Sequence, residues 1–207
     1  MSSFAQAMDF RHACKKFDAT RQIPDEQFNQ ILEFARLSPS SFGMEPWRFV
    51  VVQTPELREQ LKACCWNQAQ VTDSSHVVVI LATTAAVKAG SDYVKTIFKR
   101  RNLPADQLEG YLIRYGIHQQ TEVEPYMSLY AWSAKQCYIV LANMMTGAAS
   151  LGIDSCPLEG FVKVDVESLL NIDTTQYEVA VVVAFGYRAG EQPAHLRQPI
   201  EAMLEYR

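Results

Sequence analysis

Two nearly continuous runs of apolar residues constrain the fold of this chain most strongly. They cover His76–Ala82 and Glu178–Gly186, and both are rich in β-branched residues. Runs of this length and composition are typical of strands buried in the middle of a sheet. A third apolar run, Arg48–Val52, follows a loop of serine, proline and glycine. The sequence therefore predicts three strands, of which at least two are central.

Helical patterns separate these strands. Apolar residues recur at three- and four-residue steps, and helices are expected at residues 3–10, 24–37, 55–65, 125–151 and 164–170. The longest of these helices carries several small residues, which would let another helix approach closely, either at the centre of the molecule or at a subunit interface. Gly152 is expected to end it, because glycine readily adopts the conformation that closes a helix.

Two segments are less regular. Residues 87–125 indicate two helices divided near Asn102–Pro104, and this excursion is the best candidate for a cover over a site. Its aromatic residues, Phe98, Tyr111 and Tyr115 among them, would either line a pocket or pack together. The C-terminal residues 200–207 form an amphipathic pattern that needs a surface to lie on.

Length and charge limit the class of protein. The chain has 207 residues and a net charge of −4, which fits a single domain over residues 1–207. The absence of a basic run excludes nucleic acid as an expected partner. No apolar run reaches the roughly 18 residues that a membrane span needs, and the first residues lack the layout of a signal peptide. We therefore expect a cytoplasmic protein that binds neither nucleic acid nor membrane.

The five cysteines are odd in number and scattered, which predicts reduced thiols instead of a disulfide framework. Cys137 and Cys156 lie in apolar sequence and are expected in the core. Cys14 lies among the basic side chains of residues 11–16, and their charge predicts a lowered thiol pKa. A cysteine-dependent hydrolase that uses Cys14 and His12 would follow from such a thiol. No metal site is expected.

Two stretches of polar residues are candidates for ligand contacts. If residues 11–17 are extended, Arg11 and Lys15 point the same way and can reach one anionic ligand; otherwise they form a solvated basic patch. The amide-rich residues 66–70 suit the donors and acceptors of a heterocycle, or they form an exposed polar segment.

Two turns are further candidates. The loop 38–47 brings serine hydroxyls to the start of a strand. The segment 156–161 turns on Pro157 and Gly160, and such a turn presents backbone N–H groups to a flat or anionic ligand. The same six residues would also serve as an ordinary connection between a strand and a helix.

Taken in order, these stretches resemble the nitroreductase family of FMN-dependent oxidoreductases. The segments that carry the resemblance are RHACKKFD, SPSSFGMEPWRFVVV, NQAQ, SHVVVILA, LGIDSCPLEGF, VVVAFGYR and LRQP. They are most similar to the oxygen-insensitive NAD(P)H nitroreductases and the dihydropteridine reductases. The resemblance implies an α+β fold in which helices flank a mostly antiparallel central sheet. It also implies a homodimer with exchanged C-terminal arms and two FMN sites at the interface.

The resemblance also implies which residues contact FMN. Arg11 and Arg197 would bind its phosphate, Lys15 would lie near the N1 and O2 edge, and Glu159 would lie near the N5 edge. No protein residue is expected to act as an acid or a nucleophile. The implied cofactor-binding residues are Arg11, His12, Ala13, Lys15, Ser40, Ser41, Gly43, Asn67, Gln70, Pro157, Leu158, Glu159, Gly160, His195 and Arg197. The two serines would reach the flavin ring from the other subunit.

Some positions depart from the residues that are usual in the family. Ala13 stands where relatives often have serine, and Gln70 and His195 stand where some have lysine. Phe42 and Gly43 replace smaller or polar residues at the rim of the substrate pocket. FMN binding is expected to survive these changes, whereas substrate preference is left open.

The implied activity is hydride transfer from NADH or NADPH to nitroaromatics, quinones or similar planar acceptors, in a ping-pong sequence of two-electron steps. Two alternatives belong to other classes of protein. One is a specialised enzyme of the same fold, such as a dehalogenase-like or flavin-cleaving relative. The other is an FMN-binding protein that turns over no NADH or NADPH.

Overall fold

A four-stranded antiparallel sheet forms the centre of the computed structural model, which describes residues 3–207. Its strand order is β1-β2-β4-β3. The strands are β1 (Trp47–Val52), β2 (His76–Thr83), β3 (Asp154–Leu158) and β4 (Tyr177–Gly186). Nearly every residue of the two central strands is buried, as their apolar sequences predict. The three predicted strands are therefore confirmed.

The edge strand β3 was not predicted. Its residues Cys156, Pro157 and Leu158 were expected to belong to a turn. β3 pairs with β4 from Asp154, opposite Gly186, to Leu158, opposite Val182. Proline lacks an N–H donor and is found in sheets mainly on edge strands. The position of β3 at the edge explains why a strand can contain this residue.

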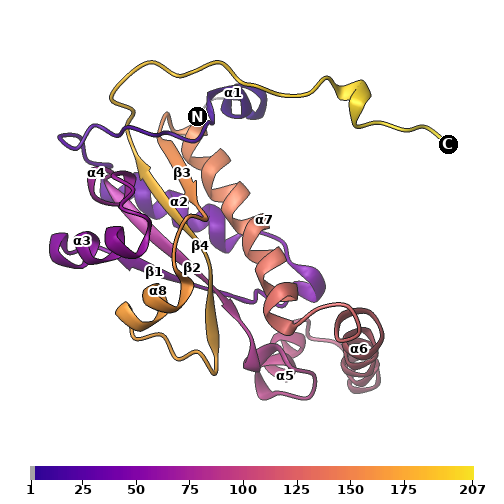
Figure 1. The fold of residues 1–207 in the computed structure, drawn as a ribbon. Coiled ribbons are helices and arrows are strands. Elements are labelled where there is room, and N and C mark those ends of the chain that lie inside the picture. Colours follow the sequence, from indigo (N-terminus) through magenta and orange to yellow (C-terminus); the bar gives the residue numbers. More distant parts are fainter. Residues whose placement is uncertain (1–2) are drawn as a thin grey trace.

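Helices cover both faces of the sheet (Figure 1). Their bounds are α1 (Phe4–Phe10), α2 (Asp25–Arg36), α3 (Pro55–Cys64), α4 (Gln70–Asp73), α5 (Asp92–Lys99), α6 (Ala105–His118), α7 (Leu129–Ser150) and α8 (Lys163–Leu169). Alternate residues of β2 face opposite sides. Val78 and Ile80 pack with α2 and α7, whereas Val77 and Val79 pack with α3, α4 and α8. The predicted α+β arrangement of helices around an antiparallel sheet is confirmed.

The long helix α7 ends as predicted at Gly152. Its φ is 75°, and the N–H groups of Gly152 and Ile153 donate to the carbonyls of Ala149 and Ala148, both at 3.0 Å. These two bonds satisfy carbonyls that the end of the helix leaves free, in the pattern of a Schellman motif. The chain can therefore turn directly from α7 into β3.

The excursion forms a small core of its own. Helices α5 and α6 are separated at Asn102–Pro104, as predicted, and a π-helical turn, Gln119–Val123, leads back toward α7. Phe98 and Tyr115 are fully buried. The aromatic residues of the excursion therefore pack together, which decides between the two alternatives that the sequence left open.

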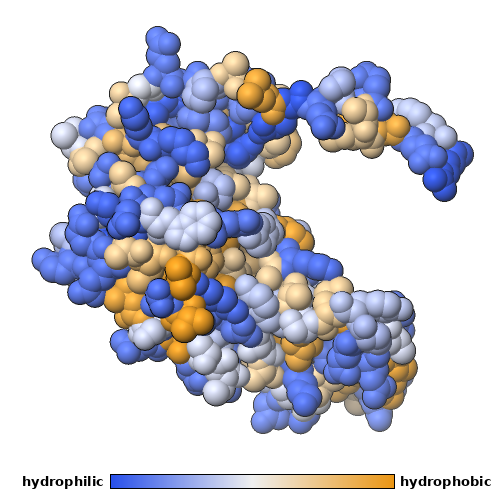
Figure 2. All heavy atoms as spheres, in the orientation of Figure 1, coloured by the Kyte–Doolittle hydropathy of each residue, from blue (hydrophilic) through white to orange (hydrophobic). Residues whose placement is uncertain are grey.

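The C-terminal arm, residues 189–207, leaves the body of the molecule and extends into solvent (Figures 1 and 2). It carries exposed apolar side chains at Leu196, Ile200, Met203, Leu204 and Tyr206. Within residues 3–207, no helix combines the length and the apolar composition of a membrane span. The predicted domain, 1–207, also includes Met1 and Ser2, which lie outside the described residues together with the start of the segment that was compared with a signal peptide.

The close packing of α7 on α2 depends on Gly147, where an added Cβ would lie 2.1 Å from Cδ2 of Phe34. Gly147→Ala must displace this ring, and we expect it to lower the free energy of unfolding by about 1–3 kcal/mol. Gly110→Ala, in α6, is the matched control because its Cβ would meet no atom within 4 Å. Urea denaturation measures both, and equal losses of stability would contradict this packing.

Candidate functional site

The N-terminal stretch, residues 11–17, lies along the outer edge of β3. Ala13 and Ser155 form a parallel bridge, and the N–H of Cys14 donates to the carbonyl of Ser155 at 3.0 Å. Ala13 and Cys14 are thus paired with the sheet, whereas the chain bends at Lys15 and Lys16, so the stretch is not extended along its whole length. The paired part occupies an edge that would otherwise leave backbone groups unpaired. A hollow of about 370 Å³ lies beside it, lined mainly by residues 12–16 and 188–191.

Lys15 reaches the middle of β3. Its Nζ donates to Sγ of Cys156 at 3.7 Å, directly before Pro157. The structure therefore brings Lys15 to β3, at the residue before Pro157, although the two are far apart in the sequence. The core positions predicted for Cys156 and Cys137 are confirmed, since both are fully buried.

The turn after β3 offers free backbone donors. Within residues 3–207, no protein acceptor is recorded for the N–H groups of Glu159 and Gly160. On its other side, the carbonyl of Gly160 accepts a hydrogen bond from Nε2 of Gln68 at 2.9 Å. A Cβ on Gly160 would lie 2.6 Å from Cε3 of Trp66. A side chain at this position would therefore displace the exposed ring of Trp66 from the turn.

The residues that contact Gly160 differ from those that the sequence analysis selected in the same stretch. It selected Asn67 and Gln70 from the amide cluster and passed over Trp66 and Gln68. Trp66 and Asn67 both have left-handed φ angles, 53° and 55°, and both side chains are exposed. Gln70 is buried at the start of α4. The sequence does not distinguish Gln68 from the neighbouring amide residues, because its hydrogen bond to Gly160 depends on how the distant turn folds.

Tyr138 is a second residue that sequence reasoning missed. It lies on α7, and its hydroxyl donates to Oε1 of Glu159. Burial raises the pKa of Tyr138, and the hydrogen bond and the charge of Glu159 raise it further. The phenol therefore keeps its proton and holds the carboxylate at the end of β3. Helical spacing marks Tyr138 only as a residue of α7, because its partner lies elsewhere in the chain.

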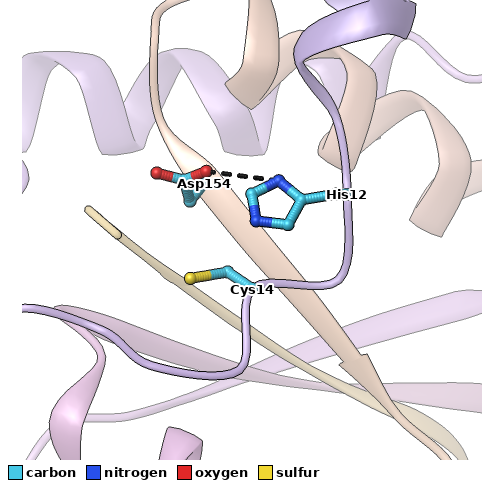
Figure 3. Close-up of side chains that lie close together, drawn as sticks. All are labelled: His12, Cys14 and Asp154. Carbon is cyan, nitrogen blue, oxygen red and sulfur yellow. Dashed lines mark ion pairs between the residues drawn. The ribbon is translucent and has the colours of Figure 1, made fainter. Parts of the chain in front are cut away.

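Asp154 ties three segments together at the start of β3. Its carboxylate, which is buried, accepts hydrogen bonds from the backbone N–H of Arg188 at 2.9 Å and from Nε of Arg188 at 2.8 Å. Nδ1 of His12 lies 3.7 Å from the same carboxylate, and Figure 3 shows this pair together with Cys14. Burial lowers the pKa of His12, so the imidazole is neutral at pH 7.

The side chains of His12, Cys14 and Asp154 lie within 4.8 Å of one another and could be taken for metal ligands. The guanidinium of Arg188 already supplies the positive charge next to the carboxylate. A metal ion would have to displace both this guanidinium and the proton of the thiol. The cluster is better suited to joining the N-terminal stretch to the sheet.

The predicted lowering of the Cys14 pKa is wrong. Burial raises the pKa of this thiol to about 11, and the negative charge of Asp154 adds to the effect. The neighbouring side chains of Lys15 and Lys16 are exposed, whereas Cys14 is buried beneath the stretch. Adjacent positions in the sequence therefore do not place these cations around the sulfur. A protonated, buried thiol gives no support to the cysteine-dependent hydrolase.

The predicted residues Ser40, Ser41, Phe42 and Gly43 lie apart from this group. The N–H of Ser41 donates to Oε1 of Gln136 on α7 at 2.9 Å. Positions 136 and 138 are roughly 200° apart around a helix. Since Tyr138 holds Glu159, the loop that contains Ser40 and Ser41 and the end of β3 contact opposite sides of α7. One chain therefore does not bring the two groups together.

The start of the C-terminal arm returns to the N-terminal stretch. Nε2 of His195 lies 2.7 Å from the carbonyl oxygen of Asp9, and Nε2 of Gln192 donates to the same oxygen at 3.1 Å. Arg197 follows two residues later and is exposed. The arm thus passes beside the end of α1 before it extends into solvent.

The raised pKa of Cys14 predicts a slow reaction with alkylating reagents. At pH 8 only about one thiol in a thousand would be ionised. We expect iodoacetamide to label Cys14 at least about a hundredfold more slowly in the native protein than in the denatured chain. Peptide mass spectrometry follows the modification, with Cys64, which is partly exposed, as an internal reference. Equal rates in the native and denatured protein would contradict the burial of this thiol.

Comparison with solved structures places this arrangement among known folds. A protein from Exiguobacterium sibiricum, provisionally named a nitroreductase and solved in complex with FMN, superimposes with a TM-score of 0.84. The superposition covers 100% of this chain and 98% of the other, at 22% sequence identity. At this level of identity the likeness shows the fold, and the expected nitroreductase-like fold is confirmed.

Sequence comparison gives the family. A Staphylococcus epidermidis protein, provisionally named an NAD(P)H nitroreductase, is 47% identical over 200 residues, which cover 91% of this chain and 89% of that protein. YfkO of Bacillus subtilis carries the same provisional name and is 42% identical over 210 residues, which cover 97% and 95%. The sequence pattern of the Nitroreductase family matches residues 8–187. The chain therefore belongs to the nitroreductase family.

Proposed function

We propose that this chain is an FMN-dependent enzyme that takes electrons from NADH or NADPH and reduces nitroaromatics, quinones or similar planar acceptors. Bound FMN would supply the hydride chemistry, and the protein would supply binding, placement and charge. Donor and acceptor would use the same face of the cofactor in turn, which gives ping-pong kinetics. The names of the relatives described above agree with this activity.

The observation that carries the proposal is the contact of Lys15 with β3, the strand that leads into the turn at Glu159 and Gly160. Nζ of Lys15 lies 3.7 Å from Sγ of Cys156, and the same strand leads into the turn where, within residues 3–207, the N–H groups of Glu159 and Gly160 have no protein acceptor. Lys15 also lines the hollow along the N-terminal stretch. Such donors suit a flat ring that gains electrons, because they stabilise negative charge without having to reorganise. The residues present therefore fit FMN.

Each segment would have its own task. Arg11 and Arg197 would hold the phosphate, for which a guanidinium offers a fork of donors. Lys15 would place its charge at the N1 and O2 edge. The backbone of Pro157–Gly160 would lie along the ring, with an N–H directed toward N5. The implied contacts of Asn67 and Gln70 with the pyrimidine ring stay predictions of the same kind.

The second subunit would supply Ser40 and Ser41. Their loop and Glu159 contact opposite sides of α7, which supports a site completed by a partner chain. The exposed apolar residues of the arm support the same conclusion, because a homodimer that exchanges these arms would cover them. FMN would then lie at the interface in two equivalent copies.

Two substitutions test the proposed roles separately. Lys15→Ala removes the charge at the reacting edge, and we expect it to slow flavin reduction by NADH or NADPH roughly tenfold or more while FMN stays bound. Arg197→Ala removes a phosphate contact, and we expect FMN to be lost on dialysis. Stopped-flow absorbance follows the reduction, and flavin fluorescence follows the retention.

Lys95→Ala serves as the control, because among residues 3–207 this exposed lysine forms an ion pair with Asp92 alone, on the surface of α5. An unchanged rate of reduction in Lys15→Ala would contradict the role of Lys15. A yellow wild-type protein that neither NADH nor NADPH bleaches would instead indicate an FMN-binding protein without this activity. A specialised relative of the same fold would be bleached but would reduce neither quinones nor nitroaromatics.

A further inference from the structure

The loop over residues 40–45, here called the Phe42 loop, has a strained backbone. Phe42, Gly43 and Glu45 have φ angles of 55°, 63° and 47°. Bulky residues such as Phe42 rarely adopt this left-handed region, and they remain there only where surrounding contacts hold them. The contacts that hold Phe42 therefore decide how this loop presents its side chains.

Arg101, in the excursion, holds the backbone of Phe42. Its Nη2 donates to the carbonyl oxygen of Phe42 at 2.9 Å. The guanidinium also lies over two rings, with Cζ 4.9 Å from the centroid of Tyr111 and 5.6 Å from that of Phe98. A planar guanidinium can stack and donate at the same time, which a lysine cannot do. The rings thus aim the donor at the strained residue.

The side chain of Phe42 is held by the same excursion. Its ring centroid lies 5.2 Å from that of Tyr115 and 5.1 Å from that of His118. Tyr93 adds a hydrogen bond from its hydroxyl to the carbonyl of Met44 at 2.8 Å. Both the carbonyl and the ring of Phe42 are therefore fastened to one segment, the excursion.

We propose that Arg101 is a positioning residue that sets which acceptors the site admits. The proposal rests on the proposed function, in which the Phe42 loop of one chain completes the site of the other. By holding the carbonyl of Phe42, Arg101 keeps the ring packed against Tyr115 and His118, outside the acceptor pocket that the proposed function would form beside Ser40 and Ser41. Without Arg101, the loop leaves its strained conformation, and the ring is free to turn into the pocket. Large acceptors are then excluded before small ones.

The experiment compares Arg101→Ala with Arg114→Ala in the FMN-loaded protein. Arg114 is the matched control, because its Cζ lies 5.4 Å from the Tyr111 centroid and no contact with the Phe42 loop is recorded for it in the described residues. For Arg101→Ala we expect the KM for menadione to rise about fivefold or more. The KM for 1,4-benzoquinone and both kcat values should change less than about twofold. Arg101→Lys should be intermediate, because it keeps a donor but loses the stacking.

Hydrogen exchange of the peptide that contains residues 40–45 gives a measurement that does not depend on activity. We expect exchange to be about fivefold faster or more in Arg101→Ala than in wild type and Arg114→Ala. Unchanged exchange would show that Arg101 does not hold the Phe42 loop. Faster exchange with equal KM changes for both quinones would show that Arg101 holds the loop but does not decide which acceptors bind. A wild-type protein that retains no FMN would overturn the proposed function and, with it, the role of Arg101 in acceptor choice. The exchange experiment would still measure whether Arg101 holds the Phe42 loop.

Discussion

The buried carboxylate of Asp154 fixes the geometry on which the candidate site depends. It accepts two hydrogen bonds from Arg188, just after β4, and faces His12 in the N-terminal stretch. Removing one partner of a buried ion pair typically costs about 3–5 kcal/mol, because the other charge stays buried without compensation. This interaction thus joins β3, β4 and the N-terminal stretch, in which Lys15 contacts Cys156 of β3.

Helix α7 divides the remaining parts of the site. On one side of the helix, Gln136 binds the Phe42 loop at Ser41. On the other side, Tyr138 binds Glu159, so these contacts keep the loop and the end of β3 apart. The excursion adds a second restraint on the Phe42 loop through Arg101 and Tyr93. Within one chain, the loop that contains Ser40 and Ser41 and the end of β3 therefore lie on different sides of α7. Pairing of two chains would unite them.

An element could be predicted from the sequence where a pattern within one segment determines it, and could not where contacts between distant residues determine it. The central strands β2 and β4 could be predicted because burial on both faces leaves an apolar run in the sequence. β3 could not, because it is short and contains Pro157, which its edge position permits. The cofactor residues came from the resemblance to a family, and nothing in the sequence indicates the tertiary contacts among them. The contact of Lys15 with Cys156 of β3 appears only in the structure.

Contacts between distant residues were beyond sequence reasoning. No spacing connects Tyr138 with Glu159, Gln68 with Gly160, or Arg101 with Phe42. Cys14 shows the converse error, since its basic neighbours in the sequence suggested a lowered pKa. The fold instead buries the sulfur and turns the lysines outward. Local patterns therefore indicated which segments matter, whereas the partners and protonation states of their residues needed the tertiary structure.

Native mass spectrometry of the purified protein tests the central claim, that two chains together form the FMN site. The account predicts a dimer that carries two FMN molecules and loses them when it dissociates. A monomer that holds FMN as tightly as the dimer would contradict it.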